Sequence, residues 1–444
     1  MRNLQFVSNK RSAVGPIEEI RAYSRLLHDP ADLDEFIDRA ADAKVVMLGE
    51  ATHGTHEFYT WRNIISKRLI NEGGFNFIAV EGDWPDCYRL NRYLKNYPQA
   101  GDSAYSVLQA FNRWPTWMWA NWEMVALAEW LYEHNQALPI THKVGFYGLD
   151  VYSLWESMEA IMHYLQQTDP LAFQAAQAAY HCFEPYQTDE GQSYAQASQF
   201  VPKLCEQEVI SLLAQVRQRM ANYNTDHENV FNAEQNALIL TNAEKYYRAM
   251  LRGGAFSWNI RDRHMADTLH RLLNYHGPQA KAIIWAHNTH IGDARATIMH
   301  DQGMFNLGEL IRNELGYDQV FLAGLGTYRG QVIAAPAWGS PERTYEVPPA
   351  VEHSWDAILH TVHEANQVIL MHHLSHPDLL NQRIRQRAIG VVYHPHREQH
   401  YNYVPSEMTN RYDAYLFFYR TKAMHPLHVT ADQSQMPETY PFGV

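Results

Sequence analysis

The sequence is poor in cysteine and has no long hydrophobic run. Its 444 residues include only Cys87, Cys182 and Cys205, which form no C-x-x-C pair and are too few for a disulfide framework. This usage favours a reducing compartment. No apolar stretch has the 18 residues of a membrane-spanning helix, and the first 20 residues lack the apolar core of a secretory signal. We therefore predict a cytoplasmic protein.

Basic residues are also scarce. Lys and Arg number 36 against 49 Asp and Glu, so the formal net charge is −13. Because an acidic surface repels phosphate backbones and anionic lipids, nucleic acid and membranes are poor candidates for partners. Hydrophobic residues make up 46% of the chain and aromatic residues 13%, enough to fill a large core and to line a pocket. A small molecule is the expected partner, and the oligomeric state stays open.

Several common enzyme motifs are absent. No G-x-S-x-G occurs, since Gly101–Tyr105 lacks the final glycine, which argues against a serine hydrolase with a nucleophile elbow. There is no H-E-x-x-H zinc motif and no P-loop, and Gly324–Gly330 is one residue too long for a dinucleotide fingerprint.

Short apolar runs recur along the chain, and continuous runs of this length are typical of strands buried on both faces of a parallel sheet. Helical patterns at 32–42, 58–71 and 265–275 lie between them. The alternation predicts an α/β fold with a mostly parallel central sheet flanked by helices. The predicted strands are Lys44–Leu48, Phe75–Val80, Lys143–Tyr147, Lys281–Trp285, Gln319–Leu322, Gln367–Met371, Ala388–Tyr393 and Ala414–Tyr419.

One stretch departs from this alternation. Residues 153–252 have helical periodicity almost throughout and predict an all-helical insertion between the third and fourth strands. The α/β core is then discontinuous, with residues 1–152 and 253–431, and residues 432–444 form a polar tail. After the insertion, Asn259 or Asp262 is expected to cap a helix that begins near Met265.

The predicted strands end in residues suited to catalysis. In open parallel sheets, ligands bind at the carboxyl ends of the strands. Four distant segments deliver carboxylates and imidazoles to this rim: Glu50 and His53, Glu81, Asp150, and His287 with His290. Taken singly, Glu81 could instead cap a helix or pair with an arginine, and Asp150 could cap the helix that starts at Ser153.

The densest segment follows the first strand. Gly49 and Gly54 flank a tight turn, where glycine permits a positive φ, and the turn would present Glu50 and His53 together. A glutamate beside a histidine orients the ring and raises its basicity, as in the base of a hydrolase. Arg62, on the next helix, would balance the acidic cluster or hold an oxyanion, unless it forms an ordinary ion pair on the helix surface.

Tryptophans cluster between residues 111 and 122. Trp117 and Trp119, with Trp114 and Trp122, would form an apolar wall for a bulky ligand or, alternatively, anchor the core.

The motifs as a set resemble the erythromycin esterase family. VVMLGEATHGTHEFYTWR, AVEGDWPD, YGLD, WNIRD and AHNTHIG occur in that family's order, and the likeness spans about Lys44 to Leu427. It implies an α/β core with a helical insertion and hydrolysis of an ester, in the best-known members the macrolactone of erythromycin-like antibiotics. It also implies a reaction without metal or other cofactor, in which a histidine activates water.

Carried over by position, the resemblance makes His53 the general base and Glu50 its supporting carboxylate. Glu81, Arg62 and His287 complete the expected catalytic set. We expect the substrate itself to contact residues of the rim and of the tryptophan cluster, namely Trp117, Trp119, Asp150 and His290.

Two other hypotheses remain at this point. The first is a metallohydrolase, whose divalent ion is held by rim and turn residues with an open coordination position. Its ligands would come from His53, His56, His287, His290, Glu50 and Glu81. The second is a binding protein without enzymatic activity, which sequesters a hydrophobic small molecule in the tryptophan-rich pocket.

Overall fold

The structure is a computed structural model. It describes residues 15–189, 192–201, 204–219, 226–251, 254–376, 379 and 382–428. The predicted tail, 432–444, lies outside the described residues.

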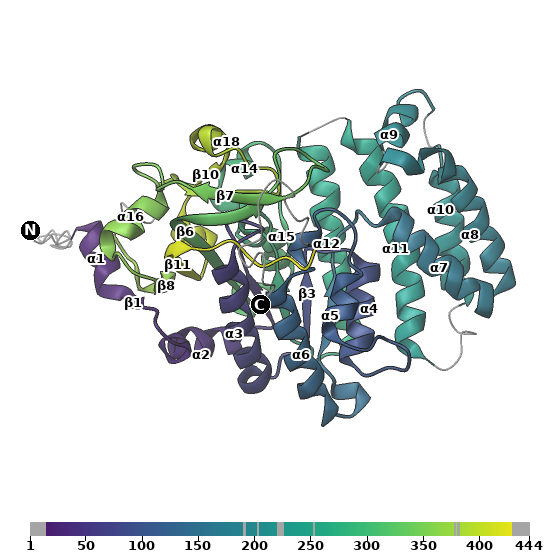
Figure 1. Ribbon diagram of the computed structural model, residues 1–444, viewed down its shortest axis with the longest axis horizontal. Helices are drawn as coiled ribbons and strands as arrows, with labels where there is room; N and C mark the ends of the chain where they lie inside the picture. Colours follow the sequence, from purple (N-terminus) through teal and green to yellow (C-terminus); the bar gives the residue numbers. More distant parts are fainter. Residues whose placement is uncertain are drawn as a thin grey trace, which may run out of the picture.

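A mostly parallel sheet runs through the middle of the molecule (Figure 1). Its parallel strands lie in the order β11-β6-β2-β5-β3-β4, while β8, β1 and β7 add antiparallel pairings. The predicted α/β class is confirmed. The strands are β1 Ser24–Leu26, β2 Val45–Leu48, β3 Phe77–Val80, β4 Gly145–Gly148, β5 Ala282–Trp285, β6 Val320–Ala334, β7 Arg343–Val347, β8 Gln367–Leu370 and β11 Ala414–Thr421, with β9 Ile384–Arg387 and β10 Tyr403–Ser406 as a separate antiparallel pair.

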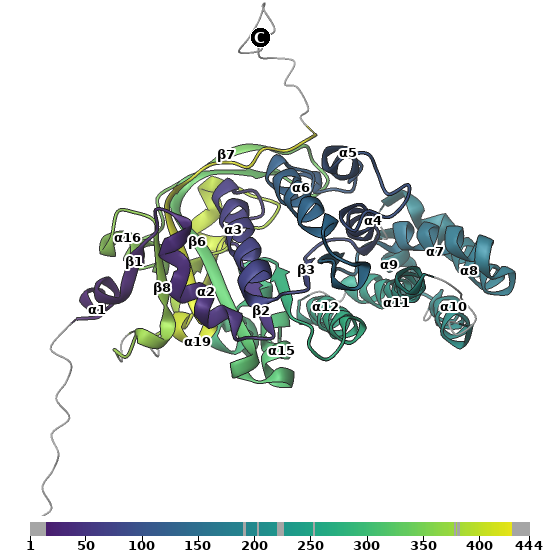
Figure 2. The same ribbon diagram turned by 90° about the horizontal axis from the view of Figure 1, so that it is seen from below.

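Helices cover both faces of this sheet (Figure 2). On one face lie α2 (Asp34–Ala41), α3 (His56–Gly73) and α6 (Trp122–Gln136), and on the other lie α12 (Ala255–His276) and α15 (Leu307–Leu315). Successive strand residues point to opposite faces. Val46 and Leu48 of β2 therefore pack in one hydrophobic cluster, and Val45 and Met47 in the other. Burial on both faces explains why the strands are continuous apolar runs.

Shorter helices complete this part of the chain. They are α1 Pro16–Tyr23, α4 Trp84–Leu94, α5 Ala104–Gln109, α13 Asn288–Ile291, α14 Ile298–Asp301, α16 Trp355–Val362, α18 Glu398–Tyr401 and α19 Met408–Arg411. The 3₁₀ turns are η1 Pro30–Leu33, η2 Thr116–Met118, η3 Ile140–His142, η4 Glu184–Asp189, η6 Ala294–Ala296, η7 Tyr317–Gln319, η8 Met371–His373 and η9 Pro395–Arg397.

Between β4 and α12 the chain is helical and lies beyond the β4 edge of the sheet, to the right in Figure 1. These helices share a hydrophobic cluster of their own, which includes Leu154, Phe183 and Leu240. The division into a core and an insertion stays a prediction. The helices are α7 Leu154–Thr168, α8 Pro170–Phe183, α9 Gln192–Ser198, α10 Glu206–Arg219 and α11 His227–Met250.

The predicted strand Ala388–Tyr393 is wrong. β9 ends at Arg387, and the following residues form only isolated bridges, Ile389 with Thr52 and Val392 with Ala335. The run is apolar because Ile389 and Tyr393 are buried in a small cluster beside β6 and β7. Burial against a neighbouring element and entry into a sheet leave the same short apolar signature.

The predicted start of a helix near Met265 is also wrong, because α12 begins at Ala255. Asn259 and Asp262 therefore lie inside the helix rather than at its cap. The carbonyl oxygen of the Asn259 side chain accepts the Phe305 N–H, and the Asp262 carboxylate contacts His290 and the Leu307 N–H. These tertiary bonds override the weak preference of Asn and Asp for helix ends.

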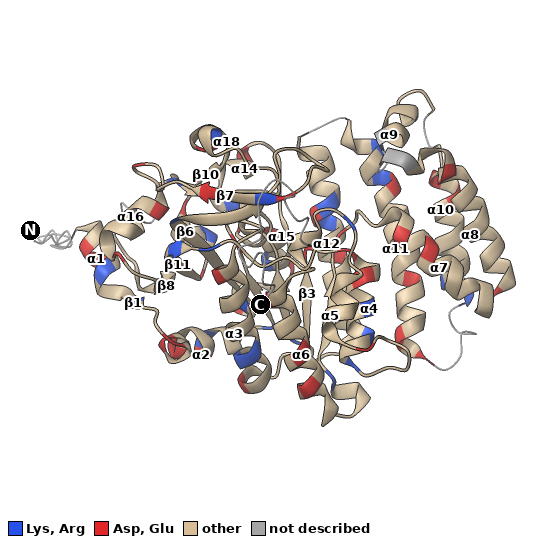
Figure 3. Ribbon diagram, viewed as in Figure 1, with Lys and Arg blue, Asp and Glu red and all other residues tan. Residues whose placement is uncertain are grey.

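Cys182 and Cys205 form a disulfide within the helical stretch, whereas Cys87 is free and buried. Three cysteines thus supply one cross-link, contrary to the expectation drawn from their number. The cytoplasmic location stays a prediction. Among the described residues, none of the helices combines the length and hydropathy needed to span a bilayer. Figure 3 shows acidic and basic residues interspersed over the helices around the sheet.

Candidate active site

A cavity of about 450 Å³ opens at the carboxyl ends of the strands. β2, β5, β3 and β4 are neighbours in the sheet, so the residues that follow them are brought to one rim. Of the predicted site residues, the structure brings six to the cavity wall: His53, Glu81, Trp119, Asp150, His287 and His290. Glu50, Arg62 and Trp117 do not line it.

His53 and Glu50 form a pair in the turn after β2. Nδ1 of His53 lies 2.9 Å from Oε1 of Glu50, and the two residues are 8% and 1% exposed. Since a carboxylate accepts, Nδ1 carries the proton and Nε2 is left as the basic nitrogen of a ring that lines the cavity. The turn thus presents the two residues together, as the sequence predicts.

The glycines of this turn act through close packing. Neither Gly49 nor Gly54 has a positive φ, contrary to the expectation. A Cβ atom on Gly49 would lie 2.0 Å from Oδ1 of Asn288, and one on Gly54 would lie 2.0 Å from the Ile333 carbonyl oxygen. Any side chain at Gly49 would push the turn away from α13, and any side chain at Gly54 would push it away from β6.

Arg62 lies behind the pair rather than in the cavity. Its Nη2 donates to Oε2 of Glu50 at 2.7 Å, and its guanidinium stacks on Tyr59 and Trp285 at 4.3 and 4.7 Å. The arginine is fully buried. Of the roles considered for it, the geometry supports balancing the Glu50 charge and not holding an oxyanion.

His287 faces His53 across the rim, with ring centroids 4.9 Å apart. Its Nδ1 lies 2.8 Å from the Thr289 hydroxyl, which can donate to it, and accepts the backbone N–H of Thr289 at 3.3 Å. Its Nε2 is buried without a hydrogen-bond partner in the described part of the chain. Burial and the neighbouring His53 hold the pKa of His287 well below its usual value, so the ring is neutral. A neutral ring that accepts at Nδ1 carries its one proton on Nε2.

Both carboxylate oxygens of Glu81 accept hydrogen bonds at the rim. Its Oε2 accepts the backbone N–H of His287 at 2.8 Å, and its Oε1 accepts from Arg261 at 2.7 Å. Burial opposes its charge, but His290 and Arg261 outweigh burial and hold the pKa of Glu81 well below its usual value. Of the alternatives open in the sequence, the pairing with an arginine is the one observed.

Arg261 is the site residue that the sequence analysis missed. From α12 it donates Nε and Nη2 to the two oxygens of Asp150 at 2.9 and 2.6 Å, and Nη2 also reaches Glu81. Asp150 therefore does not cap the Ser153 helix, and Ser153 itself makes no side-chain cap. The only available signal was the presence of Arg261 in the WNIRD motif.

His290 is held inside the same network. Its Nδ1 lies 2.9 Å from Asp262, and its ring stacks on Trp258 with centroids 4.4 Å apart. Burial disfavours its charge, but the carboxylates of Asp262 and Glu81 outweigh that effect and raise the pKa of His290 to about 9. The carboxylates thus favour the charged ring at neutral pH, and Nη1 of Arg261, 3.0 Å from its Nε2, opposes that charge.

This pKa predicts a pH-dependent stability. The pKa of His290 in the folded protein, about 9, exceeds the usual 6.5. The charged ring therefore adds its full share to the free energy of unfolding below pH 6.5, and this share is lost as pH rises through 9. We expect the free energy of unfolding of the wild type, relative to His290→Gln, to fall by about 3 kcal/mol across this interval. Urea unfolding of both proteins from pH 6 to 10 measures the difference, and a constant difference would contradict the assignment.

The tryptophans divide between wall and core. Trp119 lines the cavity and donates Nε1 to the Glu81 carbonyl at 3.2 Å. Trp114 and Trp338 also line it, with their rings tilted against each other and their centroids 4.6 Å apart. Trp117 is completely buried and contacts Trp114 edge-on. Trp119 therefore forms part of the cavity wall, and Trp117 anchors the core. Trp122 does neither, because it is 53% exposed on α6.

The histidines proposed as metal ligands do not converge. His56 points away from the rim, and its Nδ1 contacts Glu123 at 2.6 Å. Within the described ranges, the groups of three ligand atoms that lie within 4.8 Å of one another are Glu35, His372 and His373, and His56, Glu123 and His425. Neither group includes a residue that lines the cavity, and the carboxylates of Glu50 and Glu81 are paired with arginines.

The α/β sheet, the histidine–glutamate pair at its rim and the cavity lined by tryptophans suit a hydrolase. The erythromycin esterase family model matches residues 70–421. The chain belongs to the erythromycin esterase family, whose members hydrolyse ester bonds. The turn that carries Glu50 and His53 precedes the matched range.

Curated relatives agree with this membership. The chain is 24% identical over 315 residues to erythromycin esterase type II of Escherichia coli, covering 66% of this chain and 71% of the relative. It is 22% identical over 309 residues to a putative hydrolase, YbfO, of Bacillus subtilis, covering 65% of each chain.

Solved structures share the fold. A Bacillus cereus protein superposes with a TM-score of 0.77 at 18% identity, covering 93% of this chain and 98% of that one. A succinoglycan biosynthesis protein gives 0.74 at 18% identity, with 92% and 97% covered. A mutant erythromycin esterase in its open conformation gives 0.67 at 14% identity, with 90% and 97% covered.

Proposed function

We propose that the protein hydrolyses a carboxylic ester with water activated directly by His53, without a metal ion. The observation that carries this proposal is the His53–Glu50 pair, whose Nδ1–Oε1 distance of 2.9 Å leaves Nε2 as the base on the cavity wall. Nη2 of the buried Arg62 donates to Oε2 of Glu50 and holds this carboxylate in place, so that Glu50 orients the ring and stabilises it when it gains a proton.

The reaction proceeds through two proton transfers. Nε2 of His53 takes a proton from water as the water oxygen bonds to the ester carbonyl carbon. The tetrahedral intermediate then collapses, the carbon–alkoxide bond breaks, and His53 returns its proton to the leaving oxygen. The products are a carboxylic acid and an alcohol, and no group remains on the protein.

His287 is placed to stabilise the negative oxygen of the intermediate. It is neutral, its Nε2 carries a proton without a partner, and its ring lies 4.9 Å from that of His53. A donor aimed at developing charge in a dry site lowers the barrier more than one in water. Glu81 and Arg261 act as positioning residues, since Glu81 holds the backbone N–H of His287.

The cavity supports a bulky and partly apolar substrate. Its volume, about 450 Å³, suits a small-molecule ligand, and Trp114, Trp119 and Trp338 supply apolar surface. We propose a macrolide lactone as the first substrate to test, because the E. coli relative is named an erythromycin esterase. Macrolide resistance would then be the biological role.

Mass spectrometry of an erythromycin-type macrolide and a panel of acyclic esters tests the proposal. We expect a gain of one water in at least one substrate, at an unchanged rate after the enzyme has been dialysed against a strong chelator. Loss of activity in chelator, restored by a divalent ion, would support the metallohydrolase instead. Saturable binding of every candidate ester without any product would support a binding protein.

A further inference from the structure

A cluster of two histidines and a glutamate lies outside the cavity, where α3, α6 and the segment that follows β11 meet. It consists of His56 at the start of α3, Glu123 in the first turn of α6, and His425. Nδ1 of His56 and Nδ1 of His425 lie 2.6 and 2.7 Å from the same oxygen, Oε1 of Glu123. The His53 mechanism does not use these residues.

We propose that these three residues bind a divalent transition-metal ion. One ring nitrogen from each histidine and one carboxylate oxygen lie within 4.8 Å of one another. Two imidazoles and a carboxylate suit Zn²⁺ and its neighbours rather than Mg²⁺ or Ca²⁺, which prefer oxygen ligands alone. Three protein ligands leave a fourth position for water.

The surroundings of the cluster favour an ion held in place. The Glu123 side chain is 5% exposed, so its carboxylate is fixed inside the protein, while His425 is 62% exposed and gives access. Nε2 of His56 lies 3.4 Å from the Thr60 hydroxyl, a contact that orients the ring. Glu57 and Lys422, which flank the cluster, carry opposite charges.

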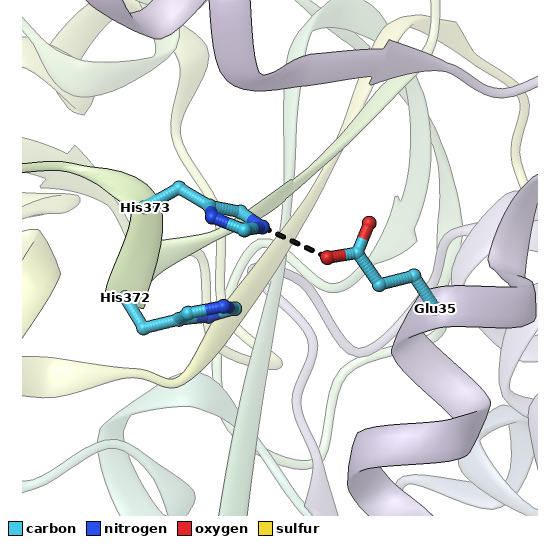
Figure 4. A group of neighbouring side chains, drawn as sticks. All are labelled: Glu35, His372 and His373. Carbon is cyan, nitrogen blue, oxygen red and sulfur yellow. Dashed lines mark hydrogen bonds and ion pairs between the residues drawn. The ribbon is translucent and has the colours of Figure 1, made fainter.

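The other group of possible ligands is a weaker site. Figure 4 shows His372 and His373 of η8 pointing toward Glu35 of α2, with a hydrogen bond from His373 at 2.8 Å. Glu35 is already paired with Arg25 at 3.5 Å, and its side chain is 44% exposed. An arginine beside the carboxylate disfavours a second cation, so this group serves as a matched control.

An ion at His56, Glu123 and His425 would fasten the segment 422–427 to the catalytic turn. Backbone hydrogen bonds already join this segment to Gly54 and His56 on one side and to Ala120 and Trp122 on the other. His56 is three residues from His53. Bound metal would therefore stabilise the turn that carries the base without entering the cavity.

Calorimetric titration of the chelator-treated full chain with Zn²⁺ tests this site. We expect one equivalent to bind and to raise the Tm, because the ion binds the folded state. His425→Ala should weaken binding at least tenfold and abolish the Tm shift, and His373→Ala should bind as the wild type does. Because His425 is exposed, the variant is expected to fold, and near-UV circular dichroism checks this.

A second variant and probe keep the test decisive. His56→Gln should also lose the site, and the visible absorption of bound Co²⁺ in the wild type should be absent from both variants. Failure of the wild type to bind, or equal binding by His425→Ala, overturns the proposal. Loss of binding in His373→Ala places the ion at Glu35, and loss in His53→Ala places it at the cavity rim; either result also overturns it.

Discussion

Replacement of His53 by alanine is expected to lower kcat/KM for ester hydrolysis by on the order of 10²–10⁴-fold, the usual contribution of a positioned general base. The His53 ring lines the cavity, and its Nδ1 is bonded to Glu50, so its Nε2 is the nitrogen available to take the proton from water. Initial rates on the best substrate of the ester panel measure the effect.

His142→Ala is a suitable control, because His142 is exposed on η3, away from the cavity. It should retain wild-type activity. The urea unfolding curve of His53→Ala should stay close to that of the wild type, which separates catalysis from folding. A folded His53→Ala protein that keeps its activity would remove His53 as the base and turn attention to His287.

Replacement of Arg261 by methionine is expected to destabilise the protein by about 3–5 kcal/mol, the cost of leaving buried charges without their partner. Arg261 donates hydrogen bonds to Asp150, at 2.6 and 2.9 Å, and to Glu81, at 2.7 Å. Those carboxylates are 5% and 4% exposed, so water cannot replace the guanidinium. The free energy of unfolding in urea at neutral pH measures the loss.

Arg263→Met, two residues further along α12, is the matched control. Its side chain is 47% exposed and lies 3.7 Å from Glu314, and such surface pairs contribute at most about 1 kcal/mol. Addition of Asp150→Asn to Arg261→Met should recover part of the stability, since it removes one of the unpaired charges. Equal stability of Arg261→Met and Arg263→Met would show that the network does not support the fold.

The local pattern of apolar residues was enough to predict most strands of the sheet. The strands β2, β3, β4 and β5 are short apolar runs because both of their faces are covered by helices. The same pattern failed at Ala388–Tyr393, where burial occurs without strand pairing. Apolar runs report burial, and they do not distinguish a central strand from a buried loop.

The rim could be predicted in part. Glu50, His53, Glu81, Asp150 and His287 follow strands, and parallel strands bring such residues to one edge whatever their order. The order itself was not predictable. The insertion of β5 between β2 and β3 sets the His287 ring beside His53, and strand order depends on the packing of the whole chain.

The sequence by itself determined the α/β class, the family and the pairing of His53 with Glu50, because these depend on residues close together or on motifs in order. Only the tertiary structure decided which neighbours each side chain has. In the fold, Arg62 bonds to the carboxylate oxygen of Glu50 that is not bonded to His53, and Trp117 is buried in the core. Arg261 of α12 donates to Asp150 and Glu81. Contacts such as those of Arg261 with Asp150 and Glu81 join distant parts of the chain and leave no periodicity in a single sequence, so only the folded chain shows them.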